Sequence, residues 1–363
     1  MTKNLLYIMH LDWKYFKQRP QFMAEELSNF YNITVIHFYS KRYLFRNSDN
    51  KTPNEKEINI KPAFRLPLYE NDMIYKINKV YLRLYFKFII KKYKPDILWI
   101  TFPQLYDYIS PTNNLKIIYD CMDNITSESF DEKFLKKILD LEIKLLKKAD
   151  LVFVPSKSLA NKINEREKCQ DKLFVINNAF DGKIMDDNDV NCDNKRRNYI
   201  IGYIGTITSY FDFDLLENSL ERFDNIEYHI IGPLDEVNLD LNKKIKFYGP
   251  IEHGKLLDYI HNFDAMIMPF KLYDSVIVAD PVKFYEYINY NKPIISIFYN
   301  EIKRYEPFVS FYSNKEEFFE VLEVLINKKF AKKYSDNERI QFLKDNTWNN
   351  RVKKIVNLLE SID

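Results

Sequence analysis

The sequence predicts an α/β protein built from two domains, each with a parallel β-sheet flanked by helices. Short apolar runs alternate with helical patterns along the first half of the chain, which is typical of βαβ units. The same alternation starts again after a polar segment at residues 181–198, which shows no apolar periodicity and is the predicted linker. The length of 363 residues also suits two domains of ordinary size.

The first domain is expected over residues 1–180. Its apolar runs predict strands at residues 4–9, 33–38, 96–101, 116–119, 151–154 and 173–176. Helical periodicity between these runs predicts helices at residues 20–30, 73–93 and 129–148.

The second domain is expected over residues 199–335, followed by a C-terminal helix within residues 336–363 that packs back on the first domain. Strands are predicted at residues 199–204, 227–231, 245–248, 265–268 and 293–297. Helices are predicted at residues 213–222, 253–262, 281–290 and 315–328. Because ligands bind beyond the carboxyl ends of parallel strands, the candidate site residues are those that follow the strands, at a cleft between the domains.

Composition excludes several classes of protein. Hydrophobic residues make up 46% of the chain and charged residues 29%, which is ordinary for a globular protein. No apolar run approaches the ~20 residues of a transmembrane helix, and the apolar start of the chain is too short for a signal peptide. The three cysteines, Cys121, Cys169 and Cys192, are widely spaced, which favours reduced structural thiols in a cytoplasmic protein.

The two halves of the chain differ in charge. Residues 1–180 carry 30 Lys and Arg against 21 Asp and Glu, a net charge of +9, whereas residues 181–363 carry 24 against 31, a net charge of −7. Part of the basic excess lies in residues 74–94, which predict a basic amphipathic helix. Its apolar residues at helical spacing are Ile77, Tyr81, Leu84, Phe88 and Ile89.

Such a helix favours an anionic membrane surface as a partner. The alternative is an ordinary helix that docks on the sheet and leaves its basic face in water. No nucleic-acid partner is expected, because the sequence carries no signature of a nucleic-acid-binding fold.

All six glycines lie in the second half of the chain. The first half therefore has no glycine-rich phosphate loop. Gly202 and Gly205 flank the end of the first strand of the second domain. They either let the backbone approach a bound phosphate closely or form a tight strand-to-helix turn without a ligand.

A cation stands in an unusual place in the segment "ADPVKFYEYI", residues 279–288. Asp280 is a suitable N-cap and Pro281 a suitable first helical residue. Lys283 then falls in the first turn, where the helix dipole disfavours positive charge. A bound anion would explain this lysine, and Glu286 shares its face of the helix. The alternative is a surface Lys–Glu pair.

Several motifs together resemble those of one enzyme family. The second half reads "GYIGTITSYFDFDLL", "HIIGP", "KFYGPIEHGKLLDYI", "DPVKFYEYINYNKPIIS" and "TWNNR", and the first half reads "DWKYFKQRPQF", "YDCMDNI", "KKADLVFVPSKSL" and "VINNAFD". Their order and spacing resemble the GT-B glycosyltransferases over nearly the whole chain. The greatest similarity is to the bacterial group that builds cell-surface polysaccharides, including TuaH-type enzymes of teichuronic acid synthesis. The resemblance implies two Rossmann-like domains that face a cleft.

The resemblance also implies a division of labour between the domains. The second domain would bind a nucleotide-sugar, with UDP as the expected nucleotide, and the first a lipid-linked or saccharide acceptor. Lys283 would neutralise the diphosphate, and Glu286 matches the glutamate that grips the ribose in this family. The other expected donor-binding residues are Gly202, Gly205, Thr206, Pro281, Val282 and Lys271.

Two departures from the family pattern leave the stereochemistry of transfer open. Many retaining GT-B enzymes carry a second glutamate where this chain has Val278, and basic residues where it reads "TITSYF". An inverting reaction instead needs a general base for the acceptor hydroxyl. The candidates are Asp123, Asp120 and His10, which follow predicted strands; for each, a cap or a loop hydrogen bond is the alternative.

The acceptor is assigned to Arg19, Gln21 and Asp12, because arginine pairs well with an anionic group such as a lipid diphosphate or an acidic sugar. Pro20 places Arg19 at the N-cap of a helix, and solvated surface is the alternative for these residues. The "FDFD" at residues 211–214 precedes a helix, which predicts N-capping rather than a metal-binding DxD motif. No metal or cofactor is expected, because the histidines and cysteines show no ligand spacing.

The sequence thus predicts a hexosyltransferase-type glycosyltransferase in the cytoplasm, at the inner face of the cell membrane. Two other functions stay open. One is a nucleotide-sugar epimerase or hydrolase on the same fold. The other is a non-catalytic two-domain sugar-binding protein, a class that is normally exported and carries a signal peptide.

Overall fold

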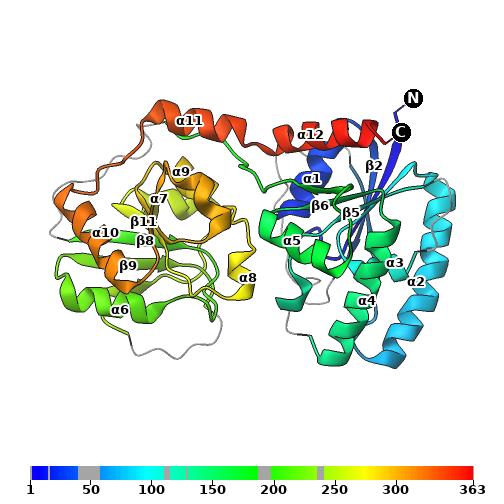
Figure 1. The fold of residues 1–363 in the computed structure, drawn as a ribbon, viewed down its shortest axis with the longest axis horizontal. Coiled ribbons are helices and arrows are strands. Elements are labelled where there is room, and N and C mark those ends of the chain that lie inside the picture. The colour runs from blue at the N-terminus through cyan, green and yellow to red at the C-terminus, as the bar shows by residue number, and fades with distance from the viewer. Residues whose placement is uncertain are drawn as a thin grey trace. The chain divides into compact units, whose positions relative to one another are not determined.

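A computed structural model of the chain consists of two compact units (Figure 1). The first contains Met1–Asn178 and Trp348–Asp363, and the second contains Ala179–Thr347. The structure describes residues 2–14, 17–39, 58–109, 115–127, 130–186, 198–234 and 241–362.

The first unit contains a seven-stranded parallel sheet in the order β3-β2-β1-β4-β5-β6-β7. Its central strands are buried on both faces, as expected for parallel strands covered by helices, and this explains their continuous apolar runs. The strands are β1 (Asn4–Met9), β2 (Asn32–Phe38), β3 (Asn59–Ala63), β4 (Ile97–Ile100), β5 (Lys116–Asp120), β6 (Leu151–Val154) and β7 (Leu173–Val175). The helices are α1 (Arg19–Leu27), α2 (Asp72–Tyr93), α3 (Pro103–Asp107), α4 (Glu132–Lys148), α5 (Lys157–Arg166), α12 (Trp348–Glu360) and the 3-10 turn η2 (Ile125–Ser127).

The second unit contains a six-stranded parallel sheet in the order β10-β9-β8-β11-β12-β13. The strands are β8 (Tyr199–Ile204), β9 (Ile226–Ile231), β10 (Ile245–Phe247), β11 (Ala265–Met268), β12 (Ile294–Ile297) and β13 (Val309–Tyr312). The helices are α6 (Phe213–Arg222), α7 (Leu256–Ile260), α8 (Asp274–Ile277), α9 (Lys283–Asn289), α10 (Lys315–Asn327), α11 (Asp336–Asp345) and the 3-10 turns η4 (His253–Lys255) and η5 (Asn300–Tyr305). The predicted fold class, two Rossmann-like parallel-sheet units, is confirmed.

The elements that the sequence analysis missed are mostly edge strands and short helices. β3 and β13 lie at the edges of their sheets. An edge strand is partly solvated, and β3 carries Lys61 and Pro62, so the apolar run that marks a central strand is missing. The helix predicted at residues 253–262 is instead η4 followed by the five-residue α7. Helices α3, α5, α8 and α11 were also not predicted.

The predicted C-terminal segment 336–363 divides between the units. Helix α11 belongs to the second unit and α12 to the first. Trp348 stacks on Phe22 of α1 with ring centroids 5.2 Å apart, and Arg351 Nε donates to the carbonyl of Asn177 at 3.2 Å. These contacts attach α12 to the first unit.

The predicted linker begins with residues that pack on the second unit. Asn289 accepts a hydrogen bond from the Met185 N–H at 3.0 Å, and Arg339 donates to the Met185 carbonyl at 2.9 Å. The rest of the predicted linker lies mostly outside the described residues, as does Cys192. Cys121 and Cys169 are buried free thiols.

Candidate functional site

At the carboxyl edge of the second sheet, glycine backbones touch one another. The N–H of Gly205 donates to the Ile231 carbonyl at 2.8 Å, and the N–H of Gly232 donates to the Gly249 carbonyl at 2.9 Å. A Cβ on Gly232 would lie 2.0 Å from the carbonyl oxygen of Gly205. These N–H groups bind carbonyls of the chain itself, and the donor-binding role of Gly205 stays a prediction.

Gly202 has a purely structural reason to be glycine. It lies inside β8, paired with His229 of β9 and Met266 of β11, rather than at the strand end. A Cβ at this position would lie 2.1 Å from the ring of Phe263. The residue therefore allows an aromatic ring to pack on the strand, and its donor-binding role stays a prediction.

Gly205 makes room for Lys283. Its φ of +151° favours glycine, and a Cβ there would lie 2.3 Å from both Cε and Nζ of Lys283. The lysine is half-buried, and burial lowers the pKa of its ammonium while the nearby Glu286 carboxylate raises it. Within the described part of the chain, no hydrogen bond or ion pair reaches this ammonium. Its Nζ lies 6.0 Å from the centre of the Tyr203 ring, and a half-buried ammonium without a hydrogen bond or ion pair suits a ligand-binding role.

The local structure around Lys283 differs from the helix start that the sequence suggested. Helix α9 begins at Lys283 itself, and Asp280 is not its N-cap. Asp280 is buried and forms an ion pair with Arg304, while the Tyr305 hydroxyl donates to it at 3.4 Å. This ion pair anchors the loop just before Lys283. Because α9 has only seven residues, the Lys283 ammonium rather than the helix dipole is the group that would bind an anion here.

Pro281 and Val282 complete this turn. The Pro281 carbonyl accepts from the Phe284 N–H at 3.4 Å, and the Val282 carbonyl accepts from the Tyr285 N–H at 3.0 Å. Both residues are half-buried, so they shape the turn that presents Lys283.

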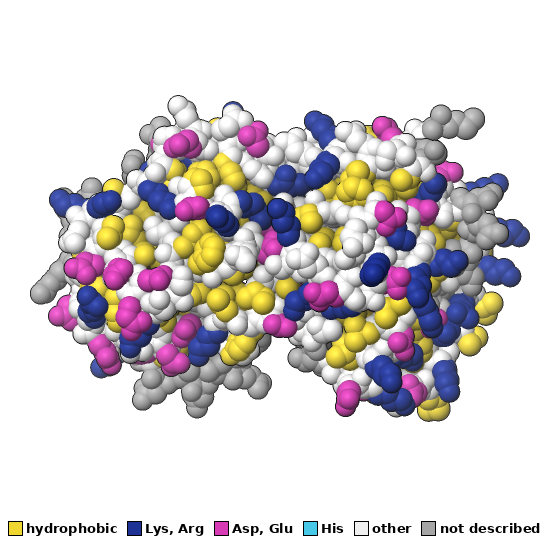
Figure 2. Space-filling model, viewed as in Figure 1, with side chains coloured by type: hydrophobic (Ala, Val, Ile, Leu, Met, Phe, Trp, Pro, Cys, Tyr) yellow, Lys and Arg dark blue, Asp and Glu magenta, His cyan; other side chains and the backbone are white. Residues whose placement is uncertain are grey.

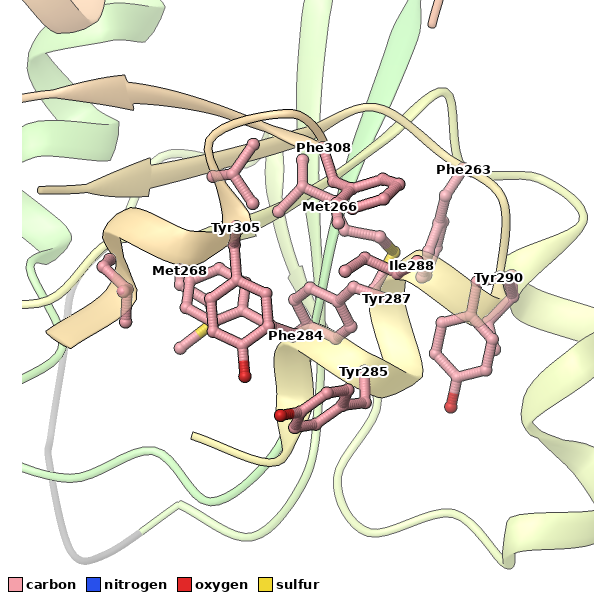
Figure 3. Close-up of a cluster of buried hydrophobic side chains, with 14 of the residues drawn as sticks. Phe263, Met266, Met268, Phe284, Tyr285, Tyr287, Ile288, Tyr290, Tyr305 and Phe308 are labelled. Atoms are coloured by element: carbon pink, nitrogen blue, oxygen red, sulfur yellow. The ribbon is translucent and has the colours of Figure 1, made fainter. Parts of the chain in front are cut away.

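Helix α9 is embedded in an aromatic core, which fixes Lys283 next to β8. Figure 3 shows Phe284, Tyr287 and Ile288 of α9 among the buried side chains, with Met266 of β11. The Tyr287 hydroxyl accepts from the N–H of Ile204 at 3.0 Å and lies 3.2 Å from its carbonyl oxygen, to which it can donate. The last residue of β8 is thus tied directly to the helix that carries Lys283.

Two more polar groups near the end of β8 and on α9 have no partner among the described residues. The half-buried Glu286 carboxylate forms no hydrogen bond or ion pair there, and the N–H of the exposed Thr206 has no acceptor there. The Thr206 carbonyl is held by the Tyr203 hydroxyl at 2.9 Å. Together with Lys283 they supply two donors for an anion and one acceptor for hydroxyl groups.

Lys271 is engaged elsewhere. Its ammonium lies 3.2 Å from a carboxylate oxygen of Asp214, which raises the pKa of the lysine. The neighbouring Asp212 accepts a hydrogen bond from the Leu215 N–H at 3.1 Å, so the predicted N-capping by "FDFD" is confirmed. Val278 is 4% exposed.

In the first unit, Arg19 and Asp120 form a buried ion pair. Arg19 donates to Asp120 Oδ1 through Nε at 3.0 Å and Nη2 at 2.9 Å, and to the Ile176 carbonyl through Nη1 at 2.7 Å. Asp120 is 0% exposed and Arg19 5% exposed. The ion pair gives both residues a structural role, and Asp120 Oδ2 is buried without a hydrogen-bond partner among the described residues, so their roles as base and acceptor ligand stay predictions. Arg19 is also the first residue of α1, whose N-cap is Gln18.

Asp123 is placed quite differently from Asp120. Its side chain is exposed, and its carboxylate has no hydrogen bond or ion pair within the described part of the chain. An exposed carboxylate without such a partner can reach a substrate hydroxyl, whereas Asp120 is 0% exposed, so Asp123 is the better placed of the two as a candidate base.

A buried network that the sequence analysis missed supports the loop of Asp123. Glu142 is 0% exposed, pairs with Arg166 at 2.6 Å and accepts from the Tyr119 hydroxyl at 2.8 Å. Arg166 also donates to Asn124, the residue after Asp123. Glu142 falls on the apolar face of α4 beside Leu141 and Leu145, and that position was the available signal.

His10 follows β1, and its ring Nδ1 lies 3.0 Å from the Thr101 hydroxyl oxygen. Burial, reinforced by Arg65, lowers the pKa of His10 to about 3. The ring is therefore neutral near pH 7 but a weak base, which makes it less suitable than Asp123.

Gln21 is buried, as is Arg19, so the solvated-surface alternative is wrong for both, and Asp12 is buried as well. Oδ1 of Asp12 lies 3.4 Å from Nδ1 of His37 and accepts a hydrogen bond from the Lys14 N–H at 3.0 Å. Gln21 closes a capping box with Gln18 at the start of α1. Both side chains hold the loop before α1.

The described residues show no candidate metal-binding cluster and no candidate membrane-spanning helix. No group of three or more His, Cys, Asp or Glu side chains in them is arranged to hold a metal ion. None of their helices is long and apolar enough to cross a membrane.

The two parallel-sheet units define the GT-B fold, and solved structures share it over the whole chain. TarM has a TM-score of 0.71 at 12% identity and covers 99% of both chains. The lipopolysaccharide galactosyltransferase WaaB has a TM-score of 0.68 at 14% identity, also over 99% of both. HepE of Anabaena, solved with UDP-glucose, has a TM-score of 0.66 at 12% identity over 99% of this chain and 100% of that chain.

A sequence relative agrees with the predicted resemblance. TuaH of Bacillus subtilis (strain 168), named as a glycosyltransferase of teichuronic acid biosynthesis, is 23% identical over 220 residues. The match covers 54% of this chain and 54% of TuaH, so it spans about half the length of that relative. No protein-family model matches the chain.

Proposed function

We propose that this protein is a glycosyltransferase that moves a sugar from a UDP-linked donor to an acceptor in the synthesis of a cell-surface polysaccharide. The observation that carries the proposal is the half-buried Lys283 ammonium beside Gly205, which no described residue pairs. The GT-B fold, the similarity to TuaH and the UDP-glucose complex of HepE support the same reaction class.

The proposed roles at the donor follow from charge and hydrogen bonding. Departure of the nucleoside diphosphate leaves negative charge on its phosphate oxygens, and preorganised donors lower the free energy of that charge. Lys283 and the Thr206 N–H supply such donors. Glu286, an acceptor on the same helix, suits the two hydroxyls of a ribose.

For the acceptor we propose Asp123 as the general base. The acceptor hydroxyl attacks C1 of the sugar, its proton passes to the Asp123 carboxylate, and the C1–O bond to UDP breaks. This assignment corresponds to an inverting reaction. Val278 supports it, because it is apolar and 4% exposed at the position where the resemblance to retaining enzymes would place a second glutamate. The saccharide acceptor is suggested by TuaH and by TarM, which was solved with α-GlcNAc-glycerol and UDP.

Calorimetric titration with UDP, GDP, dTDP and CMP tests the donor site. UDP should bind most tightly, and Lys283→Met should weaken it by about 10–150-fold, the equivalent of a charged hydrogen bond of about 1.5–3 kcal/mol. Lys315→Met is the matched control, because Lys315 is an exposed lysine of the same unit. Unchanged UDP affinity in Lys283→Met would refute the donor site.

A second titration isolates Glu286. Wild-type protein should prefer UDP to 2′-deoxy-UDP, and Glu286→Gln should reduce that preference. Equal preference in both proteins would remove the ribose assignment. Product analysis with UDP-sugars then separates transfer from hydrolysis and epimerisation, because only transfer requires an acceptor for turnover.

A further inference from the structure

Helix α2 exposes a stripe of large apolar side chains. Met73 is 69% exposed, Val80 64%, Leu84 67% and Phe88 60%. Ile77 and Tyr81 are exposed between them, at 50% and 42%. Scattered exposed apolar residues are normal, but a continuous set on one helix marks a surface that meets an apolar environment. We call these six residues the α2 stripe.

The α2 stripe is distinct from the face by which α2 packs on its own unit. With 3.6 residues per turn, its members span an arc of about 100°. The buried residues of α2 lie on the opposite side, and they are Tyr75, Asn78, Leu82, Phe86 and Ile89. Of the apolar residues that the sequence grouped on one face, only Ile89 is in the core. The helix therefore has two apolar faces, and core packing explains only one.

Cations line the α2 stripe. Lys76, Lys87 and Lys91 are exposed, and none forms an ion pair within the described part of the chain. Lys79 and Arg83, by contrast, pair with Asp107 at 2.7 and 3.4 Å. Figure 2 shows Lys and Arg side chains along the edge where α2 lies, with hydrophobic side chains exposed beside them. At 100° per residue, Lys76 and Lys87 fall next to the stripe.

We propose that the α2 stripe inserts into the interface of an anionic lipid bilayer, with α2 lying parallel to the membrane plane. Exposed Leu, Phe, Met and Ile enter the boundary between headgroups and acyl chains, and the free lysines contact anionic headgroups. Charge complementarity selects this occupant over a second copy of the chain, because two copies of the stripe would bring like charges together. The inference is independent of the proposed sugar transfer.

Vesicle flotation of the full chain tests the proposal. The protein should float with phosphatidylcholine vesicles that contain phosphatidylglycerol, and bind pure phosphatidylcholine at least tenfold more weakly. Leu84→Glu combined with Phe88→Glu should abolish binding to the mixed vesicles. The matched control is Val324→Glu, because Val324 is a 50% exposed apolar residue on α10 of the other unit; it should bind as the wild type does.

Depth of insertion gives an independent readout. Phe88→Trp should show tryptophan emission that is quenched by brominated lipid, whereas Val324→Trp should not. Absence of vesicle binding, unchanged binding of Leu84→Glu/Phe88→Glu, or unquenched Phe88→Trp would each overturn the proposal. So would a wild-type oligomer that the double substitution converts to monomer, because the stripe would then be an interface between copies.

Discussion

Replacing Gly205 with alanine tests whether this glycine exists to admit Lys283. The new Cβ would lie 2.3 Å from Cε and Nζ of Lys283 and 3.0 Å from the Tyr203 hydroxyl. No contact with backbone is that close, so the flexible end of the lysine should move rather than the fold. The φ of +151° adds strain of about 1–3 kcal/mol to the folded state.

We expect two separate effects of Gly205→Ala. UDP affinity should fall by about 10–150-fold, because the displaced ammonium loses a charged hydrogen bond of about 1.5–3 kcal/mol. In the absence of nucleotide, the free energy of unfolding should fall only by the amount of the backbone strain at residue 205. Calorimetric titration measures the first effect, and urea unfolding measures the second.

A double-mutant cycle makes the test strict. In a Lys283→Ala background the clashing atoms are gone, so Gly205→Ala should cost no further UDP affinity. An equal loss of affinity in both backgrounds would show that Gly205 acts independently of Lys283. Unchanged affinity in the single variant would refute the reasoning altogether. Gly232→Ala offers a contrast, because its Cβ would meet the Gly205 carbonyl at 2.0 Å and should disturb the backbone itself.

Three further predictions concern the first unit. Trp348→Ala should destabilise that unit by about 3–5 kcal/mol, seen as faster hydrogen exchange in its strands alone, while Leu343→Ala on α11 should affect only the second unit. Burial lowers the pKa of His10 in the folded protein to about 3, whereas in the unfolded chain the pKa of this side chain is about 6.5. Between these two pH values His10 is therefore protonated in the unfolded chain but not in the folded protein. Stability should therefore fall as the pH drops through that window, and urea unfolding of His10→Asn should show a shallower fall; an NMR titration of His10 near pH 6.5 would contradict this. Asp120→Asn should cost about 3–5 kcal/mol by leaving Arg19 buried without its charge partner, and a loss below 1 kcal/mol in chemical unfolding would refute that role.

Much of the fold could be read from local patterns. Central parallel strands are apolar on both faces, so β1, β6, β8 and β11 were predicted to the residue. β3 was missed because its residues are mostly solvent-exposed and include Lys61 and Pro62. β13 was missed although Val309 and Tyr312 are buried, because the four-residue strand also contains the polar Ser310. Helix α11 was missed for a related reason, since only Arg339 and Leu343 are buried along it.

The residues of the candidate site also fall into those that local sequence could identify and those that it could not. Lys283 was found because a cation in a first helical turn conflicts with local electrostatics, a conflict visible in ten residues of sequence. The N-cap predicted at Asp280 was wrong, and the structural partners of Asp280, Gly202 and Arg19 were not foreseen, because each partner lies far along the chain. Those partners are Arg304, Phe263 and Asp120.

By itself, the sequence determined the α/β class, the two parallel-sheet units, the resemblance to GT-B glycosyltransferases and the anomalous lysine. Periodicity, helix electrostatics and motif order are local properties, so neighbouring residues are enough to express them. Only the tertiary structure decided which polar side chains are already paired. It pairs Arg19 with Asp120 in a buried ion pair, and it leaves Lys283, Glu286 and Asp123 without a hydrogen bond or ion pair among the described residues. The tertiary structure also decided that the α2 stripe faces solvent, because the face of a helix that is buried depends on which other elements pack against that helix.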